Sequence, residues 1–224
     1  MAFLARHCES VSGKIGTPGN VVQPGTSKTC TTHAPHFNGT TADDWKLPCL
    51  VAWQRTFDDA RRVAQATGKP LLICVNMDGE IASEHYAGIR YRRPETARLY
   101  EPYVCVIASV YRHNPRDYDD AGQRIPCPRF GTVTCGEHIA IEPGLYETYF
   151  EGSRIAPRHI MVELDLKKTY DVYFAWDTQT IFTALEKGIA DRPAPPPLVE
   201  HDRPVVERVA SADAADRVLV ERTY

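Results

Sequence analysis

The stretch Lys69-Pro-Leu-Leu-Ile-Cys-Val-Asn-Met-Asp-Gly-Glu-Ile-Ala-Ser-Glu-His-Tyr86 reads as a strand, a turn and the start of a helix. Its five consecutive apolar residues, 71–75, favour a strand that is buried on both faces. Asn76, Asp78 and Gly79 favour a turn, and a helical pattern follows. Open parallel sheets carry their sites at the carboxyl ends of strands. This turn is therefore the expected position of a functional site.

Composition narrows the class of protein. The chain has 224 residues, 43% of them hydrophobic and 25% charged, which suits one soluble α/β domain with appendages. A net charge of −3 gives no reason to expect a nucleic-acid partner. No apolar run approaches the roughly 20 residues that span a bilayer. Charge also appears too early, at Arg6, for a signal peptide. We therefore expect a cytoplasmic protein without membrane contact.

Hydrophobic patterning predicts alternating strands and helices, followed by a hairpin. Thr56 is a good N-cap and Gly68 a good C-terminal stop for the first helix. The expected elements are a strand 49–53, helix 56–68, strand 70–76, helix 80–92, a second helical piece from 94, strand 103–111, helix 143–150, strands 159–165 and 169–175, and a helix 177–189.

Shifts in composition predict the domain organisation. Residues 1–42 are rich in Gly, Thr, Ser and Pro and are expected to form an irregular N-terminal arm. Residues 43–190 form the predicted domain, which includes an ordered inserted loop at 112–142. A Pro-rich linker is expected at 191–204 and a C-terminal pair of helices at 205–224.

This order of elements resembles the thioredoxin-like fold over roughly residues 45–190. In that family a proline preceded by a cis peptide bond begins the first hairpin strand and faces the active-site turn. Pro157, in the sequence Arg154-Ile-Ala-Pro-Arg158, occupies the matching position. The resemblance implies a three-layer α/β fold, with a central mixed sheet and helices on both faces.

The same resemblance does not extend to the residues on which the family's activity depends. Aligning its Cys-x-x-Cys motif with this sequence places Ala82 and His85, or Ser83 and Tyr86, at the cysteine positions. Thiol–disulfide exchange needs one thiolate to attack and a second to resolve the mixed disulfide. We therefore expect a non-redox domain, an interaction or accessory module for another protein rather than an enzyme.

The inserted loop carries a set of residues typical of a metal site. Cys127 and Cys135 are followed closely by His138, and His113 lies at the end of the preceding strand. Thiolates and imidazoles are the ligands that zinc prefers, and the Cys135/His138 spacing would let one tight turn present two of them. Zinc is the expected ion. A structural disulfide or two free thiols remain alternatives, and an atypical thiol–disulfide oxidoreductase using Cys127 and Cys135 is the alternative function.

A second candidate site lies at the start of the helix after the central strand. An anion or a substrate carboxylate could bind at that helix N-terminus beside an arginine. The expected ligand-binding residues are Ser83, Glu84, His85, Pro157 and Arg158. The alternative is that Glu84 is solvated and that His85 merely covers the turn.

Overall fold

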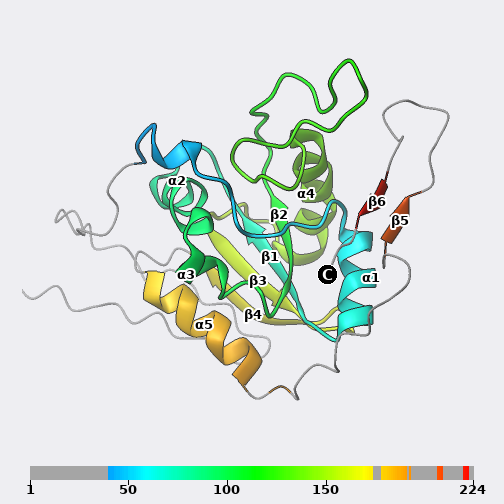
Figure 1. The fold of residues 1–224 in the computed structure, drawn as a ribbon. Coiled ribbons are helices and arrows are strands. Elements are labelled where there is room, and N and C mark those ends of the chain that lie inside the picture. The colour runs from blue at the N-terminus through cyan, green and yellow to red at the C-terminus, as the bar shows by residue number, and fades with distance from the viewer. Residues whose placement is uncertain (1–39, 174–177, 191, 193–205, 209–218, 222–224) are drawn as a thin grey trace, which may run out of the picture.

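A four-stranded mixed sheet forms the centre of the molecule (Figure 1). The computed structural model describes residues 40–173, 178–190, 192, 206–208 and 219–221. The strand order is β2-β1-β3-β4, with β1 at Leu71–Val75, β2 at Val104–Ala108, β3 at Arg158–Val162 and β4 at Lys168–Tyr173. Its helices are α1 (Phe57–Thr67), α2 (Ile81–Gly88), α3 (Pro94–Ala97), α4 (Cys135–Tyr149) and α5 (Thr178–Ala190), with 3-10 turns at Asp44–Lys46 and Arg90–Arg92.

Strand pairing agrees with the expected fold. β1 runs parallel to β2 and antiparallel to β3, and β3 and β4 form an antiparallel hairpin. Val75 pairs with Arg158, so the same register carried one residue further sets Pro157 opposite Asn76. The Ala156–Pro157 peptide bond is cis. The hairpin therefore returns to the turn that follows β1.

The sheet separates two apolar cores, as period-2 alternation along its strands requires. Leu72 and Cys74 of β1 face the core that contains α5 and Tyr86 of α2. Leu71, Ile73 and Val75 face the other core, which α1 and α4 cover. Figure 1 shows α2, α3 and α5 on one side of the sheet and α1 and α4 on the other. The three-layer thioredoxin-like α/β fold is therefore confirmed.

Local signals explain where the first helix begins and ends. The Thr56 side chain accepts a hydrogen bond from the Asp59 amide, which caps the N-terminus of α1. Gly68 ends the helix with a φ of 70°, a left-handed conformation that glycine adopts without strain. Between these ends, Ala60, Val63 and Ala64 are buried against the sheet.

The predicted loop 112–142 is too long, because its last part is helical. α4 begins at Cys135, where Thr134 and Glu137 form a capping box. Gly136 and Pro143 interrupt the apolar pattern, which is why the sequence predicts a later start at residue 143. Pro143 lies inside α4. The capping box at Thr134 therefore marks the start of the helix better than the proline does.

The structure corrects three further predictions. Instead of a strand at 49–53, it contains a single bridge between Trp53 and Cys105. The predicted helix 80–92 ends at Gly88, and a 3-10 turn follows. In the predicted C-terminal helix pair, Val206–Arg208 and Leu219–Glu221 are instead the antiparallel strands β5 and β6. Their valines favour a strand over a helix. The arm at 1–39 and the linker at 193–204 lie outside the described residues.

Candidate functional site

Four side chains from the inserted segment converge in one place. His113, Cys127, Cys135 and His138 each offer one ligand atom, and these four atoms all lie within 4.8 Å of one another. Cys127, Cys135 and His138 are buried, and His113 is nearly so. Bond lengths of about 2.0–2.3 Å imply ligand atoms about 3.3–3.8 Å apart around a tetrahedral zinc ion. A small contraction would therefore bring this group to zinc geometry, and the four residues could bind a metal.

Cys135 and His138 are presented by a helix rather than by the expected tight turn. Cys135 is the first residue of α4 and His138 lies three residues later, so both side chains lie on one face. The Cys135 Sγ accepts hydrogen bonds from the backbone amides of His113, at 3.2 Å, and Asn114, at 3.3 Å. Both amides and the helix N-terminus favour negative charge at this sulfur.

The Cys127 sulfur has a matching environment, built by a tight turn. Gly131 closes this turn by donating its amide to the Cys127 carbonyl at 2.8 Å, and its φ of 73° suits glycine. Burial raises the pKa of the Cys127 thiol, and the backbone amides of Arg129 and Phe130 act to lower it. Backbone amides therefore lie around both sulfurs.

Each histidine is oriented by a partner on its second ring nitrogen. The Asp78 carboxylate can only accept, so the Nε2–H of His113 donates to it at 2.9 Å. Nδ1 of His113 then faces the sulfurs of Cys127, at 3.3 Å, and Cys135, at 3.9 Å. Likewise, Nδ1 of His138 donates to the Ser109 carbonyl at 2.9 Å. Its Nε2 is buried without a hydrogen-bond partner among the described residues. Both rings thus direct a lone pair into the cluster.

Burial sets the protonation of this group. It lowers the pKa of His138 to about 4, and it also lowers that of His113, although Asp78 partly opposes the second shift. Both imidazoles are therefore neutral at pH 7, which is the form that binds metal ions. Burial raises the pKa of the Cys127 thiol to about 12, while the amides of Arg129 and Phe130 act in the opposite direction. A bound cation would displace the thiol proton.

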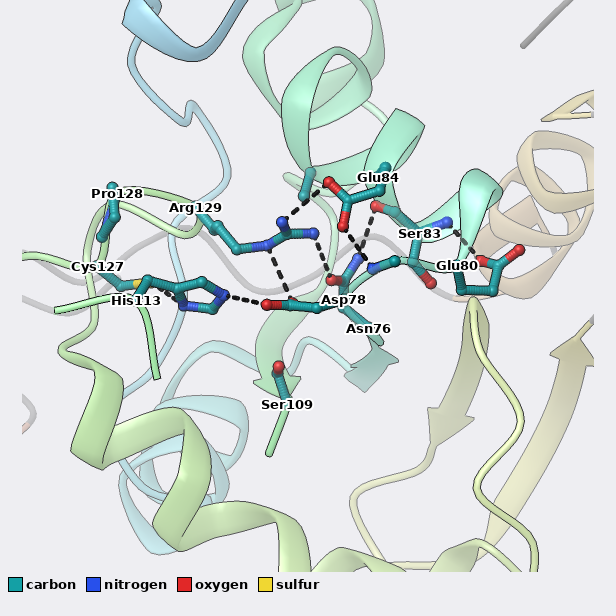
Figure 2. Close-up of polar contacts among 12 residues, drawn as sticks. Asn76, Asp78, Glu80, Ser83, Glu84, Ser109, His113, Cys127, Pro128 and Arg129 are labelled. Carbon is teal, nitrogen blue, oxygen red and sulfur yellow. Dashed lines mark hydrogen bonds and ion pairs between the residues drawn. The ribbon is translucent and has the colours of Figure 1, made fainter. Parts of the chain in front are cut away.

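Arg129 joins the inserted segment to the turn after β1 (Figure 2). Its guanidinium donates to Glu84 at 3.0 Å and to the Asn76 side chain at 3.2 Å, and it lies 3.4 Å from Asp78. Burial alone would raise the pKa of Glu84, but the hydrogen bonds from Arg129 and the Gly79 amide outweigh burial and lower it. The candidate metal ligands and this turn therefore form one polar network.

Arg92 holds the inserted segment from its other side. The Arg92 guanidinium donates to the carbonyls of Pro128 at 2.7 Å and Arg129 at 3.2 Å, directly after the candidate ligand Cys127. It also donates to the Ala87 carbonyl at the end of α2, at 2.9 Å. These bonds fix the Cys127 turn against α2 and help to explain how a segment rich in Pro and Gly keeps one conformation.

The predicted anion site at the start of α2 has a different environment. The Glu80 carboxylate accepts hydrogen bonds from the amides of Ala82, at 3.1 Å, and Ser83, at 2.6 Å, so the chain's own carboxylate takes the place of an anion. Ser83 is fully buried, and Glu84 pairs with Arg129. His85 accepts a hydrogen bond from Arg90 at 2.9 Å.

Arg158 does not join that site. Pro157 lies opposite Asn76 by register, but the next residue points to the other face of the sheet. The Arg158 guanidinium is buried against Asp171 and donates to the carbonyls of Phe150 and Ser153. The structure therefore brings the predicted metal ligands together, and it does not gather the five predicted anion-binding residues around one position.

The neighbouring His159 predicts a pH dependence of stability. It is buried beside Tyr86, its Nε2 lies 2.9 Å from the Tyr100 hydroxyl, and burial lowers its pKa to about 3. The unfolded chain takes up this proton below about pH 6.5, so stability falls as the pH drops from about 6.5 towards 3. In excess chelator, the free energy of unfolding of the wild-type protein should fall between pH 7 and pH 5. In the His159→Phe variant this fall should be smaller by about 2 kcal/mol. Equal losses in urea titrations of the two proteins would refute this assignment.

Comparison with known proteins gives one distant structural likeness and no match in sequence. No family model matches the chain, and no curated protein matches it. One similar solved structure is that of a protein named "DsbH Oxidoreductase"; the match covers 66% of this chain and 92% of that one, at 12% identity and a TM-score of 0.41. A likeness this distant carries no argument about activity. Within the residues that the structure describes, no helix has the length and apolar character needed to cross a membrane.

Sequence reasoning found the four candidate ligands but missed the residues around them. Asp78 was recognised only as a turn former, and Arg92 carried no signal at all. One available signal was that Asp78 and His113 follow neighbouring parallel strands, whose carboxyl ends meet at one edge of a sheet. The amide donors and the Ser109 carbonyl are backbone groups and leave no trace in the sequence.

Proposed function

We propose that this chain is a non-redox thioredoxin-like domain in which His113, Cys127, Cys135 and His138 hold a structural zinc ion. The observation that carries the proposal is the convergence of four ligand atoms within 4.8 Å, one of them the unpartnered Nε2 of the buried His138. Four protein ligands and no exposed position are typical of structural zinc sites, whereas catalytic sites keep one position open.

The surroundings of the ligands support the same proposal. Amides lie around both sulfurs, and both histidines have a partner on the nitrogen that faces away from the cluster. Such second-shell contacts usually accompany metal-ligating residues. A disulfide between Cys127 and Cys135 would need neither histidine, so the position of His113 and His138 favours a metal site.

The alternative function is a thiol–disulfide oxidoreductase that uses Cys127 and Cys135. The proximity of the two sulfurs favours it. Against it, both residues are 1% exposed or less, and burial raises the pKa of Cys127. Reactive cysteines are low-pKa thiols that solvent can reach. An insulin-reduction assay separates the two functions: activity that disappears in Cys127→Ser would favour the oxidoreductase.

Metal content is the direct test. Protein purified without chelator should contain about one equivalent of zinc, and Cys127→Ser or Cys135→Ser should lose most of it, because each removes a metal ligand. Cys49→Ser is the matched control, since this half-buried free thiol is not one of the four. Less than about a tenth of an equivalent of zinc, iron or copper in the wild-type protein would refute the metal site.

An accessory or interaction role completes the proposal. The turn after β1 carries no cysteine pair, and three large apolar residues are exposed just beyond the carboxyl ends of β1 and β2. These are Ile81, Val110 and Tyr111, which are 48%, 47% and 42% exposed. Exposed apolar residues at one end of a sheet suit a protein partner. None of the five described cysteines forms a disulfide, which supports a reducing compartment such as the cytoplasm.

A further inference from the structure

Asp78 lies between the candidate metal ligands and the β1–α2 turn. Its Oδ2 accepts the hydrogen bond from His113 Nε2 at 2.9 Å, and its Oδ1 lies 3.4 Å from Arg129 Nε. Figure 2 shows the Asp78 carboxylate between the His113 ring and the Arg129 guanidinium. Asp78 itself is not one of the four ligands. It therefore touches the metal site through a ligand and the turn through an ion pair.

The hydrogen bond from His113 decides which ring nitrogen can bind the metal. An imidazole that donates one N–H to a carboxylate keeps its lone pair on the other nitrogen, and its ring is held in one orientation. In His113 that other nitrogen is Nδ1, which faces both sulfurs. Without the carboxylate, the ring could rotate or change tautomer, and a ligand would be lost for part of the time.

We propose that Asp78 is a positioning residue of the metal centre, which fixes His113 for the ion and transmits metal binding to the β1–α2 turn through Arg129. This inference rests on the proposed zinc site and deepens it by naming what metal binding controls. The proposed coupling connects the metal to the β1–α2 turn, the position at which thioredoxin-like proteins carry their cysteine pair.

The route from the metal to the turn is a chain of contacts between described residues. Metal binding immobilises His113 and therefore Asp78. Arg129, paired with Asp78, also donates to Asn76 and Glu84, and Glu84 accepts the Gly79 amide at 2.9 Å. The end of β1, the turn and the first turn of α2 are thereby linked to one ligand of the ion.

Zinc affinity tests the positioning role. Competition with a chromophoric chelator should show about 10–100-fold weaker zinc binding by Asp78→Ala. Asp78→Asn should lose less, because its amide oxygen still accepts from His113. Glu142→Gln is the control: it removes a buried carboxylate from α4, the helix that carries two ligands, but its partner is Arg154. Zinc affinities of both Asp78 variants within about twofold of the wild type would overturn the proposal. If the alanine variant does not fold, Asp78→Leu, which is similar in size to aspartate and accepts no hydrogen bond, takes its place.

Hydrogen exchange tests the transmission to the turn. Adding zinc to the metal-free wild-type protein should slow amide exchange in residues 76–88. In Asp78→Ala, saturating zinc should slow exchange there less than in the wild-type protein, although the ion is bound and Arg129 still donates to Asn76 and Glu84. Equal protection in the two proteins would overturn the coupling. A wild-type protein that binds no zinc would instead refute the proposed function, so the two failures are distinguishable.

Discussion

Removing the metal with a chelator is expected to lower the midpoint of thermal unfolding by about 8–16 °C. A ligand that binds only the folded state stabilises it by about 4 kcal/mol when its free concentration is about 1,000 times its Kd. A domain of this size shifts by about 2–4 °C for each kcal/mol. The midpoint should therefore fall steeply, because the proposed ion would join the end of β2, the Cys127 turn and α4 at one point.

The control for this prediction is the Cys135→Ser variant, which lacks a ligand. Its midpoint should already be low, and the chelator should not lower it further. Calorimetry of both proteins, with and without chelator, supplies the four measurements. A wild-type midpoint that does not respond to the chelator, or an equal response in the variant, would show that the ion does not stabilise the fold through this site.

The sequence predicted the fold well because its signals are local or periodic. The apolar run 71–75, the Thr56 cap and the proline-led hairpin each specify local structure. The three-layer arrangement was implied by the resemblance of their order to the thioredoxin-like fold. The cysteines and histidines of the insertion could be grouped because few other residue types bind zinc. The structure brings their ligand atoms together, while the ion itself stays a prediction.

The remaining features were missed at one local signal, the start of α4, and otherwise depend on contacts that sequence patterns do not carry. The start of α4 was missed because Gly136 and Pro143 interrupt the helical pattern, although the Thr134 capping box marks where the helix begins. The contact of Asp78 with His113 depends on which strands are neighbours in the sheet, because Asp78 follows β1 and His113 follows β2. Arg158 was grouped with the turn residues, but its side chain pairs with Asp171, because successive side chains along a strand point to opposite faces of the sheet. Errors therefore gather where a side chain meets a distant part of the chain.

Replacing Asp171→Ala should destabilise the protein by about 3–5 kcal/mol, because it removes the carboxylate that faces the buried Arg158 cation and that also contacts Lys168 at 2.8 Å. The pair is bidentate, at 2.6 and 2.7 Å, and both side chains are 2% exposed. The carbonyls of Phe150 and Ser153 still accept from Arg158 but carry no full charge. Urea titration should therefore show a much lower midpoint for the variant, with the zinc content of the folded protein unchanged.

Two further variants give this result its meaning. The double variant Arg158→Met/Asp171→Leu should recover most of the lost stability, because apolar side chains of similar volume can replace a buried ion pair. Lys167→Ala, which breaks an exposed pair with Asp165, should leave the midpoint unchanged. A double variant that is less stable than Asp171→Ala would show that Arg158 stabilises the fold through contacts other than its ion pair with Asp171. If the double variant recovers its stability and keeps its full zinc content, Arg158 acts in stabilising the β3–β4 hairpin and not in a binding site.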